Sequence, residues 1–87
     1  RQGEAIMTFD EINDQLKEID SRLSFALSIS HGYGYIRLKL DKDCDYNLYS
    51  FTMKMYFFTP LKAFLCKTTW DKWQKLQLLI EEINDLI

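Results

Sequence analysis

Oxygen donors alternate along one short acidic segment, with the spacing that calcium-binding loops use. Asp41, Asp43 and Asp45 supply these donors, separated by a lysine and a cysteine. A calcium-binding loop also needs a glycine at its sixth position and a bidentate glutamate at its twelfth. In this chain those positions hold Tyr46 and Thr52. We therefore expect a solvated loop here and no metal site.

The nucleophiles and bases of the chain are few and lie far apart in the sequence. His31 is the only histidine, and no Asp or Glu stands within three residues of it, so catalysis or metal binding would need distant partners. Cys44 and Cys66 lack metal-ligand spacing, which predicts free thiols. The sequence holds no phosphate-binding loop, dinucleotide fingerprint or nucleophile elbow. We therefore predict a protein that is not an enzyme and has no catalytic residues, no cofactor and no small-molecule substrate.

Length and charge limit the remaining possibilities. The 87 residues are 47% hydrophobic and include three Gly and one Pro, a composition that predicts a single folded domain. We assign residues 7–87 to this domain and residues 1–6 to a tag scar or a processed leader. The net charge of −2 argues against nucleic acid as a partner. No apolar run approaches the ~18 residues of a membrane span, so we expect a soluble protein without membrane contact, located in the cytoplasm.

The first half of the chain predicts a helix followed by a β-hairpin. Thr8 and Glu11 form a capping-box pattern, and apolar residues then recur at three- and four-residue spacing, as on one face of a helix. Over residues 23–29 the apolar period becomes two, which indicates a strand, and the same period returns over residues 36–40. A two-residue turn at His31-Gly32 would join these strands. The expected cross-strand partners are Leu27 with Ile36, Phe25 with Leu38, and Leu23 with Leu40.

A third strand is predicted to follow the acidic loop. It begins near Tyr46 and ends before Thr59-Pro60, which is a typical helix start. The apolar alternation changes phase within this segment, and a β-bulge near Tyr49-Ser50 would correct it with one extra residue. In this register the expected buried residues are Phe51 and Met53, and the expected exposed residues are Thr52 and Lys54.

The end of the chain predicts helix. Residues 61–66 fit either a short helix or a fourth strand, and Thr68 or Thr69 is positioned to cap a last helix. The apolar stripe of that helix consists of Trp70, Trp73, Leu76, Ile80, Ile83 and Ile87. The predicted fold class is α+β: a three-stranded antiparallel meander sheet with the N- and C-terminal helices packed on one face, in the order α-β-β-β-(short α)-α.

Basic and aromatic side chains alternate along the face of the predicted sheet that lies opposite the core. Such a mixture can bind a protein, can follow phosphates while stacking bases, or can form an ordinary solvated face. The candidate partner-binding residues of this sheet face are Tyr35, Arg37, Lys39, Lys54, Tyr56 and Phe58.

The last helix carries more apolar residues than a single stripe needs. The surplus consists of Leu78, Leu79 and Leu86. These residues either widen the core face or bind a second copy or another protein. We predict a small non-enzymatic protein-binding module, with a homodimer left open, and in its narrower form an inhibitor of a host defence protein encoded by a phage or mobile element. The alternative is a single-stranded nucleic-acid binder that uses the sheet face.

Overall fold

The computed structural model describes residues 8–27 and 34–86. The expected leader and the expected His31-Gly32 turn lie outside these residues. The described elements are α1 (Phe9–Ile19), β1 (Leu23–Leu27), β2 (Gly34–Asp41), β3 (Cys44–Ser50), β4 (Met55–Tyr56), α2 (Phe58–Cys66) and α3 (Trp70–Leu86). The four strands form one antiparallel sheet in the order β1-β2-β3-β4. The α+β class and the antiparallel meander are confirmed, with a fourth strand beyond the predicted three.

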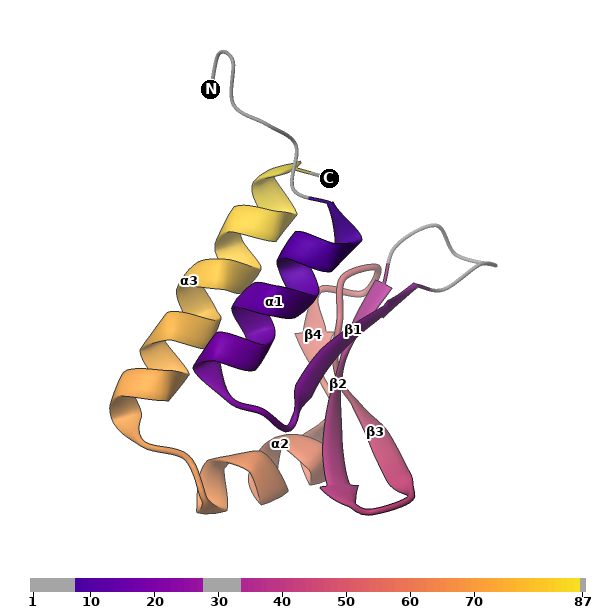
Figure 1. Ribbon diagram of the computed structural model, residues 1–87, viewed down its shortest axis with the longest axis vertical. Coiled ribbons are helices and arrows are strands. Elements are labelled where there is room, and N and C mark those ends of the chain that lie inside the picture. Colours follow the sequence, from indigo (N-terminus) through magenta and orange to yellow (C-terminus); the bar gives the residue numbers. More distant parts are fainter. Residues whose placement is uncertain (1–7, 28–33, 87) are drawn as a thin grey trace.

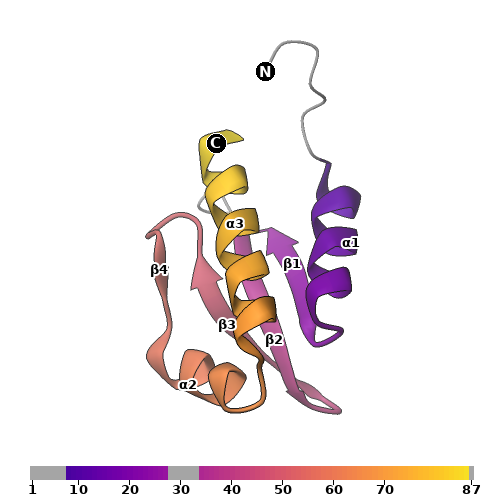
Figure 2. The ribbon, with the colours of Figure 1, turned by 90° about the vertical axis from the view of Figure 1, so that its left-hand side faces the viewer.

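The helices α1 and α3 lie side by side over one face of the sheet, as predicted (Figures 1 and 2). α2 packs against β2 and β3 and leads into α3 (Figure 1). Among the described residues, no helix has both the length and the apolar character that crossing a membrane requires. The buried core consists of Ile12, Leu16, Leu23, Ile36, Leu38, Leu48, Tyr49, Phe51, Phe64, Leu76, Leu79, Ile80 and Ile83.

The capping box at the start of α1 forms as predicted. Thr8 N donates a hydrogen bond to Glu11 Oε1 at 2.9 Å, and Glu11 N donates to Thr8 Oγ1 at 3.2 Å. These bonds satisfy backbone donors that the first turn of a helix leaves unpaired. Further along α1, Asn13 Oδ1 accepts a hydrogen bond from Phe25 N at 2.8 Å. A side chain of the helix therefore fixes α1 to β1.

The pairing of β1 with β2 differs by two residues from the predicted register. The observed partners are Leu23 with Leu38, Phe25 with Ile36, and Leu27 with Gly34. Because side chains alternate with a period of two, a slip of two residues leaves every side chain on its predicted face of the sheet. The prediction of a strand is confirmed over residues 23–27, whereas the predicted cross-strand partners are wrong.

Gly34 explains the observed register. A Cβ atom at this position would lie 2.6 Å from Cζ of Phe25 and 2.6 Å from the carbonyl oxygen of Ala26. The ring of Phe25 therefore occupies the space over Gly34 that a side chain would need. In the predicted register Leu38 would lie opposite Phe25, and Gly34 would lie too far along the strand to leave space for the Phe25 ring.

The segment that was predicted to be one long third strand is a hairpin. The chain leaves β3, turns through residues 51–54, and returns antiparallel as β4. Ser50 Oγ accepts a hydrogen bond from Met53 N at 3.1 Å, and Lys54 adopts a left-handed backbone with φ of 55°. These two local features close the turn without the glycine, proline or asparagine that usually marks one.

The turn changes the burial of its residues. Phe51 is buried, and Thr52 and Lys54 are exposed, as predicted. The side chain of Met53 is 54% exposed, so the prediction that it is buried is wrong. The reason is that Met53 lies in a turn rather than in the core-facing row of a strand.

The predicted bulge is present in β3. Ile36 pairs with Tyr49 whereas its neighbour Arg37 pairs with Asn47, so Leu48 is the extra residue. A bulge places two consecutive residues of one strand against one residue of its partner. Leu48 and Tyr49 are consequently both buried, which a regular alternation would not allow.

α2 begins earlier than predicted. Its first residue is Phe58, so Pro60 is the third residue of the helix. A proline is tolerated there because the amides of the first turn have no partner within a helix. Residues 61–66 continue α2, which decides between the helix and the fourth strand that the sequence left open.

Thr69, rather than Thr68, caps α3. Thr69 Oγ1 accepts a hydrogen bond from Lys72 N at 3.3 Å. Thr68 Oγ1 instead donates to the carbonyl oxygen of Phe64 at 2.6 Å, at the end of α2. The two threonines therefore close one helix and open the next.

Candidate functional site

Three of the predicted sheet-face residues lie together on β2. Tyr35, Arg37 and Lys39 alternate with core residues of this strand and point away from the helices. Lys39 Nζ lies 3.7 Å from Asp45 Oδ1 on β3, so a carboxylate already partners this lysine. Arg37 Nε is buried and has no hydrogen-bond partner among the described residues. This face of β2 and β3 therefore combines both signs of charge.

Tyr56 does not lie on the open sheet face, and the prediction that placed it there is wrong. Its ring contacts the rings of Tyr49 and Trp73, with centroid distances of 4.8 and 5.6 Å. Its hydroxyl accepts a hydrogen bond from Gln77 Nε2 on α3. Burial raises the pKa of Tyr56 to about 12. The chain reversal after β3 causes this change, because it returns Tyr56 to the helix-covered side of the sheet.

Lys54 and Phe58 are exposed, but on elements other than the predicted strand. Lys54 lies in the turn between β3 and β4, and Phe58 lies in the first turn of α2. Lys62 Nζ lies 6.0 Å from the centre of the Phe58 ring, which is the range of a cation–π contact. The six predicted residues therefore do not form one continuous surface.

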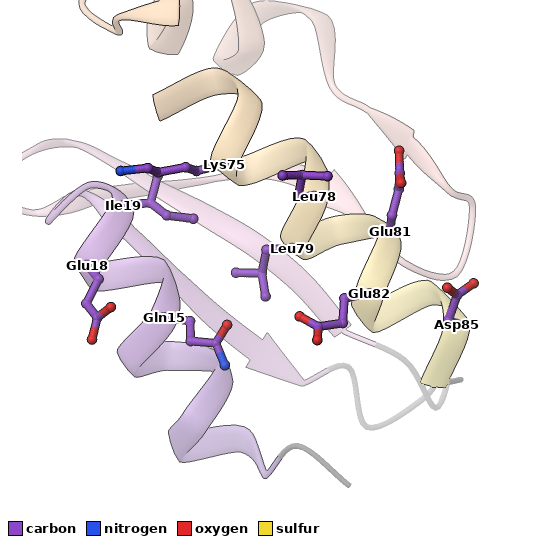
Figure 3. Close-up of a pocket in the computed structure, with 9 residues that line it drawn as sticks. All are labelled: Gln15, Glu18, Ile19, Lys75, Leu78, Leu79, Glu81, Glu82 and Asp85. Carbon is purple, nitrogen blue, oxygen red and sulfur yellow. The ribbon is translucent and has the colours of Figure 1, made fainter. Parts of the chain in front are cut away.

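The surplus leucines of α3 have three different environments. Leu78 is 66% exposed, whereas Leu86 is half-buried. Leu79 is buried and belongs to the core, so it widens the core face, which is one of the two alternatives that the sequence left open. The physical reason is its direction on α3: it points toward α1 (Figure 3).

Trp70 is 70% exposed, although its spacing placed it in the predicted core stripe. Trp70 and Leu76 are six residues apart, so a helix with 3.6 residues per turn points them roughly 120° away from each other. Trp73 lies between these directions and is half-buried against Tyr56. This angular offset is the sequence signal that could have identified Trp70 as exposed.

Trp70 and Leu78 flank a shallow hollow on the solvent side of α3. The hollow has a volume of about 340 Å³. Two large apolar side chains about two helical turns apart form a surface that would be stabilised by removal from water. We call the residues that line this hollow the α3 outer face: Trp70, Trp73, Gln74, Gln77 and Leu78.

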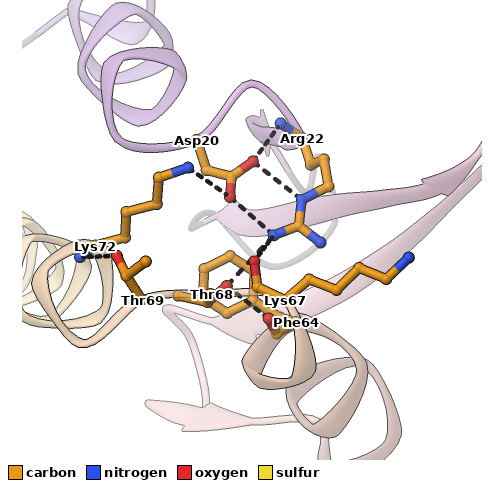
Figure 4. Close-up of polar contacts among 7 residues, drawn as sticks. All are labelled: Asp20, Arg22, Phe64, Lys67, Thr68, Thr69 and Lys72. Atoms are coloured by element: carbon orange, nitrogen blue, oxygen red, sulfur yellow. Dashed lines mark hydrogen bonds and ion pairs between the residues drawn. The ribbon is translucent and has the colours of Figure 1, made fainter.

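A partly buried ion pair holds the junction where the three helices approach one another (Figure 4). Asp20, at the end of α1, accepts hydrogen bonds from Arg22 Nε at 3.0 Å and Arg22 Nη2 at 2.8 Å. Arg22 also donates to Thr68 Oγ1 at 3.3 Å and lies over the ring of Phe64. Lys72 Nζ of α3 lies 3.6 Å from Asp20 Oδ2. The hydrogen bonds from Arg22 hold the pKa of Asp20 at about 2, well below its ordinary value of 3.8.

Sequence reasoning did not single out Asp20 or Arg22. The available signal was a pair of opposite charges two residues apart, at the point where the apolar period changes from helix to strand. Within this cluster Asp20 is paired with both Arg22 and Lys72, and the contacts join α1, β1, α2 and α3. We therefore assign the cluster a structural role.

Reactive side chains do not converge in the described part of the chain. Cys44 and Cys66 are both free thiols, as predicted, and both are exposed. The Asp41–Asp45 segment is exposed, as predicted for a solvated loop, but only Lys42 and Asp43 form the turn, because β3 begins at Cys44. Across residues 8–27 and 34–86, no three His, Cys, Asp or Glu side chains are placed to share a metal ion.

The fold and the α3 outer face together define a small α+β domain that presents aromatic and apolar side chains on one helix. Comparison with protein-family models, with curated proteins and with solved structures found no match. The geometry of the described residues is therefore the basis for proposing a function.

Proposed function

We propose that this chain is a small non-enzymatic protein-binding module that contacts its partner through the α3 outer face. The observation that carries the proposal is the exposure of Trp70 and Leu78, at 70% and 66%. Tryptophan is enriched at the energetic centres of protein interfaces, because its large flat ring loses much contact with water on burial. Gln74 and Gln77 add polar groups beside these two anchors, as is typical of an interface with an apolar centre.

Two narrower forms of this function use the same residues. In the first, a phage or mobile element encodes the chain, which acts in the cytoplasm by covering a surface of a host defence protein. In the second, the α3 outer faces of two copies meet about a two-fold axis. The compact size of the domain and the regular geometry of α3 support both forms, because a rigid helix face loses little conformational entropy on binding.

Affinity capture tests the proposal. We expect the wild-type chain to recover at least one specific protein from a lysate of the cells in which it is made, and Trp70→Ser/Leu78→Ser to lose that protein. Each anchor side chain at the centre of an interface contributes about 2 kcal/mol or more to binding. Circular dichroism melts should show that the double variant stays folded, because exposed substitutions change stability by only about 0.5 kcal/mol.

Leu40→Ser is the matched control for this capture, since Leu40 is an exposed leucine of β2 away from α3. Sedimentation velocity of the wild type and of the double variant tests whether the partner is a second copy of the chain. Recovery of the same proteins by wild type and double variant, together with a monomeric wild type, would contradict the proposal.

Binding of single-stranded nucleic acid remains the alternative and has weaker support. Tyr35, Arg37 and Lys39 share the open face of β2, but Asp45 partners Lys39. We expect no gel shift of mixed-sequence DNA or RNA at physiological salt. Sub-micromolar binding that falls steeply with salt and weakens in Tyr35→Ala, but not in the control Tyr46→Ala, would reverse this ranking, because phosphate contacts release counterions and bases stack on exposed rings.

A further inference from the structure

A groove between α1 and α3 combines an apolar floor with an acidic rim (Figure 3). Its volume is about 650 Å³. Ile19 of α1 and Leu79 of α3 line its floor, and the exposed side chain of Leu78 lies beside them. The rim carries four carboxylate side chains, of which Glu82 points toward α1, whereas Glu18, Glu81 and Asp85 lie on the outer sides of the two helices (Figure 3).

The rim carboxylates have no cationic partners in the described part of the chain. The ion pairs between described residues involve other carboxylates, namely Asp20, Asp45 and Asp71. Lys75 is the cation among the described lining residues, and its Nζ lies 3.5 Å from Asp71. The groove therefore presents four carboxylates against one ammonium group that already has a partner.

These charges work against the stability of α3. Glu81, Glu82 and Asp85 lie in the last turns of the helix, near the negative end of its dipole, and the last turn contains no basic residue. Asp85 is four residues from Glu81 and three from Glu82, which are the spacings at which like charges on a helix repel. Among the described residues no ion pair offsets this repulsion, whereas a cationic partner would relieve it.

We propose that the groove between α1 and α3 binds a basic amphipathic helix of a partner protein. This inference rests on the proposed protein-binding function and specifies the chemistry of the partner. A helix fits between two helices, where its apolar side chains would contact Ile19 and the exposed Leu78. Lysine or arginine residues three or four positions away would reach the rim carboxylates. Leu78 lines both the groove and the α3 outer face, so one partner can cover both surfaces.

Charge complementarity favours a basic helix over a second copy of the chain, a nucleic acid or a membrane as the occupant of the groove. A second copy of the chain carries the same acidic rim, and nucleic acids and anionic membranes are negative throughout. Each of these would bring like charges together, whereas a basic helix is complementary to the rim.

Titration with a designed peptide tests the inference. The probe is a fluorescein-labelled helical peptide of about 18 residues, ~27 Å long, with leucines on one face and flanking lysines. The control peptide keeps the leucines and replaces every lysine with glutamate. Fluorescence anisotropy at physiological salt should show that the folded chain binds the lysine peptide and does not bind the glutamate peptide.

Charge reversal on the protein locates the site. Glu18→Lys/Glu82→Lys should weaken binding of the lysine peptide by about tenfold. Asp41→Lys/Asp43→Lys changes the net charge equally in the distant β2–β3 turn and should change affinity by less than about twofold. Glu18→Gln/Glu82→Gln repeats the test with the smaller substitution, and a thermal melt of each variant confirms folding.

Three outcomes would overturn the inference: no binding of the lysine peptide, equal binding of both peptides, or equal effects of the two charge reversals. A wild-type dimer that dissociates in Glu18→Lys/Glu82→Lys but not in Trp70→Ser would assign the groove to a second copy and would also overturn it. The proposed function fails separately. If capture still depends on Trp70 and Leu78 while the peptide does not bind, only this inference is wrong. If the peptide binds but capture does not depend on Trp70, the α3 outer face is the wrong surface.

Discussion

Asp20→Ala should lower the free energy of unfolding by about 2–3 kcal/mol, because it removes three charge-assisted hydrogen bonds and leaves the partly buried Arg22 without its counter-charge. Asp20 is only 6% exposed and accepts three hydrogen bonds from Arg22, one of them from the backbone amide at 3.0 Å. Urea denaturation at neutral pH measures the loss. Asp71→Ala is the control, since it removes an exposed pair with Lys75 that contributes less than ~0.5 kcal/mol. Equal losses in the two variants would show that the junction does not stabilise the fold.

The pH dependence of stability follows from the same carboxyl group. The pKa of Asp20 is about 2 in the folded chain against an ordinary value of 3.8, so its ionised form stabilises the folded state. This contribution, about 2 kcal/mol, is complete above roughly pH 4 and is lost as the pH falls through 2. Asp20→Asn lacks this contribution to the free energy of unfolding at every pH. The stabilities of wild type and Asp20→Asn should therefore differ most near neutral pH and converge near pH 2.

Phe51→Ala should cost about 3–5 kcal/mol, whereas Met53→Ala should change stability by less than ~0.5 kcal/mol. Phe51 is 1% exposed and contacts the rings of Tyr49 and Phe25, with centroid distances of 4.9 and 5.9 Å. Met53 lies in the turn with its side chain in solvent. Because small domains have only about 5–15 kcal/mol of total stability, Phe51→Ala should leave little margin. Similar losses at both positions would favour the uninterrupted strand over the observed turn.

The parts of the fold that depend on local patterns were predictable from the sequence. The capping box of Thr8 and Glu11 and the change of apolar period at residue 23 place α1 and β1 correctly. The register of β1 on β2 was not predictable in this way, because an alternation of period two fits equally well after every shift of two residues. The contact of the Phe25 ring with Gly34 decides it, and that contact forms only across the hairpin.

The chain reversal after β3 had no sequence signature. Residues 51–54 are Phe-Thr-Met-Lys, and the turn depends on the Ser50 side chain and on a left-handed lysine. Because of this chain reversal, Tyr56 packs against α3 instead of lying on the predicted sheet face. Of the predicted partner-binding residues, Leu78 lies on the α3 outer face. Its exposure could be predicted, because it depends only on the direction of the side chain on the helix.

Aggregation by edge-to-edge pairing is hindered at both margins of the sheet. At one margin, the amides of Leu23 and Phe25 point away from β2 and are already bonded to the carbonyl oxygen of Asp20, at 3.0 Å, and to Asn13 Oδ1, at 2.8 Å. At the other margin, β4 is only two residues long. Polymerising strands and extended peptides need a row of unpaired backbone groups as a template. The bonded amides of β1 and the short β4 therefore reduce this template at the two margins, whereas the outer edge of β3 over residues 44–47 has no partner among the described strands.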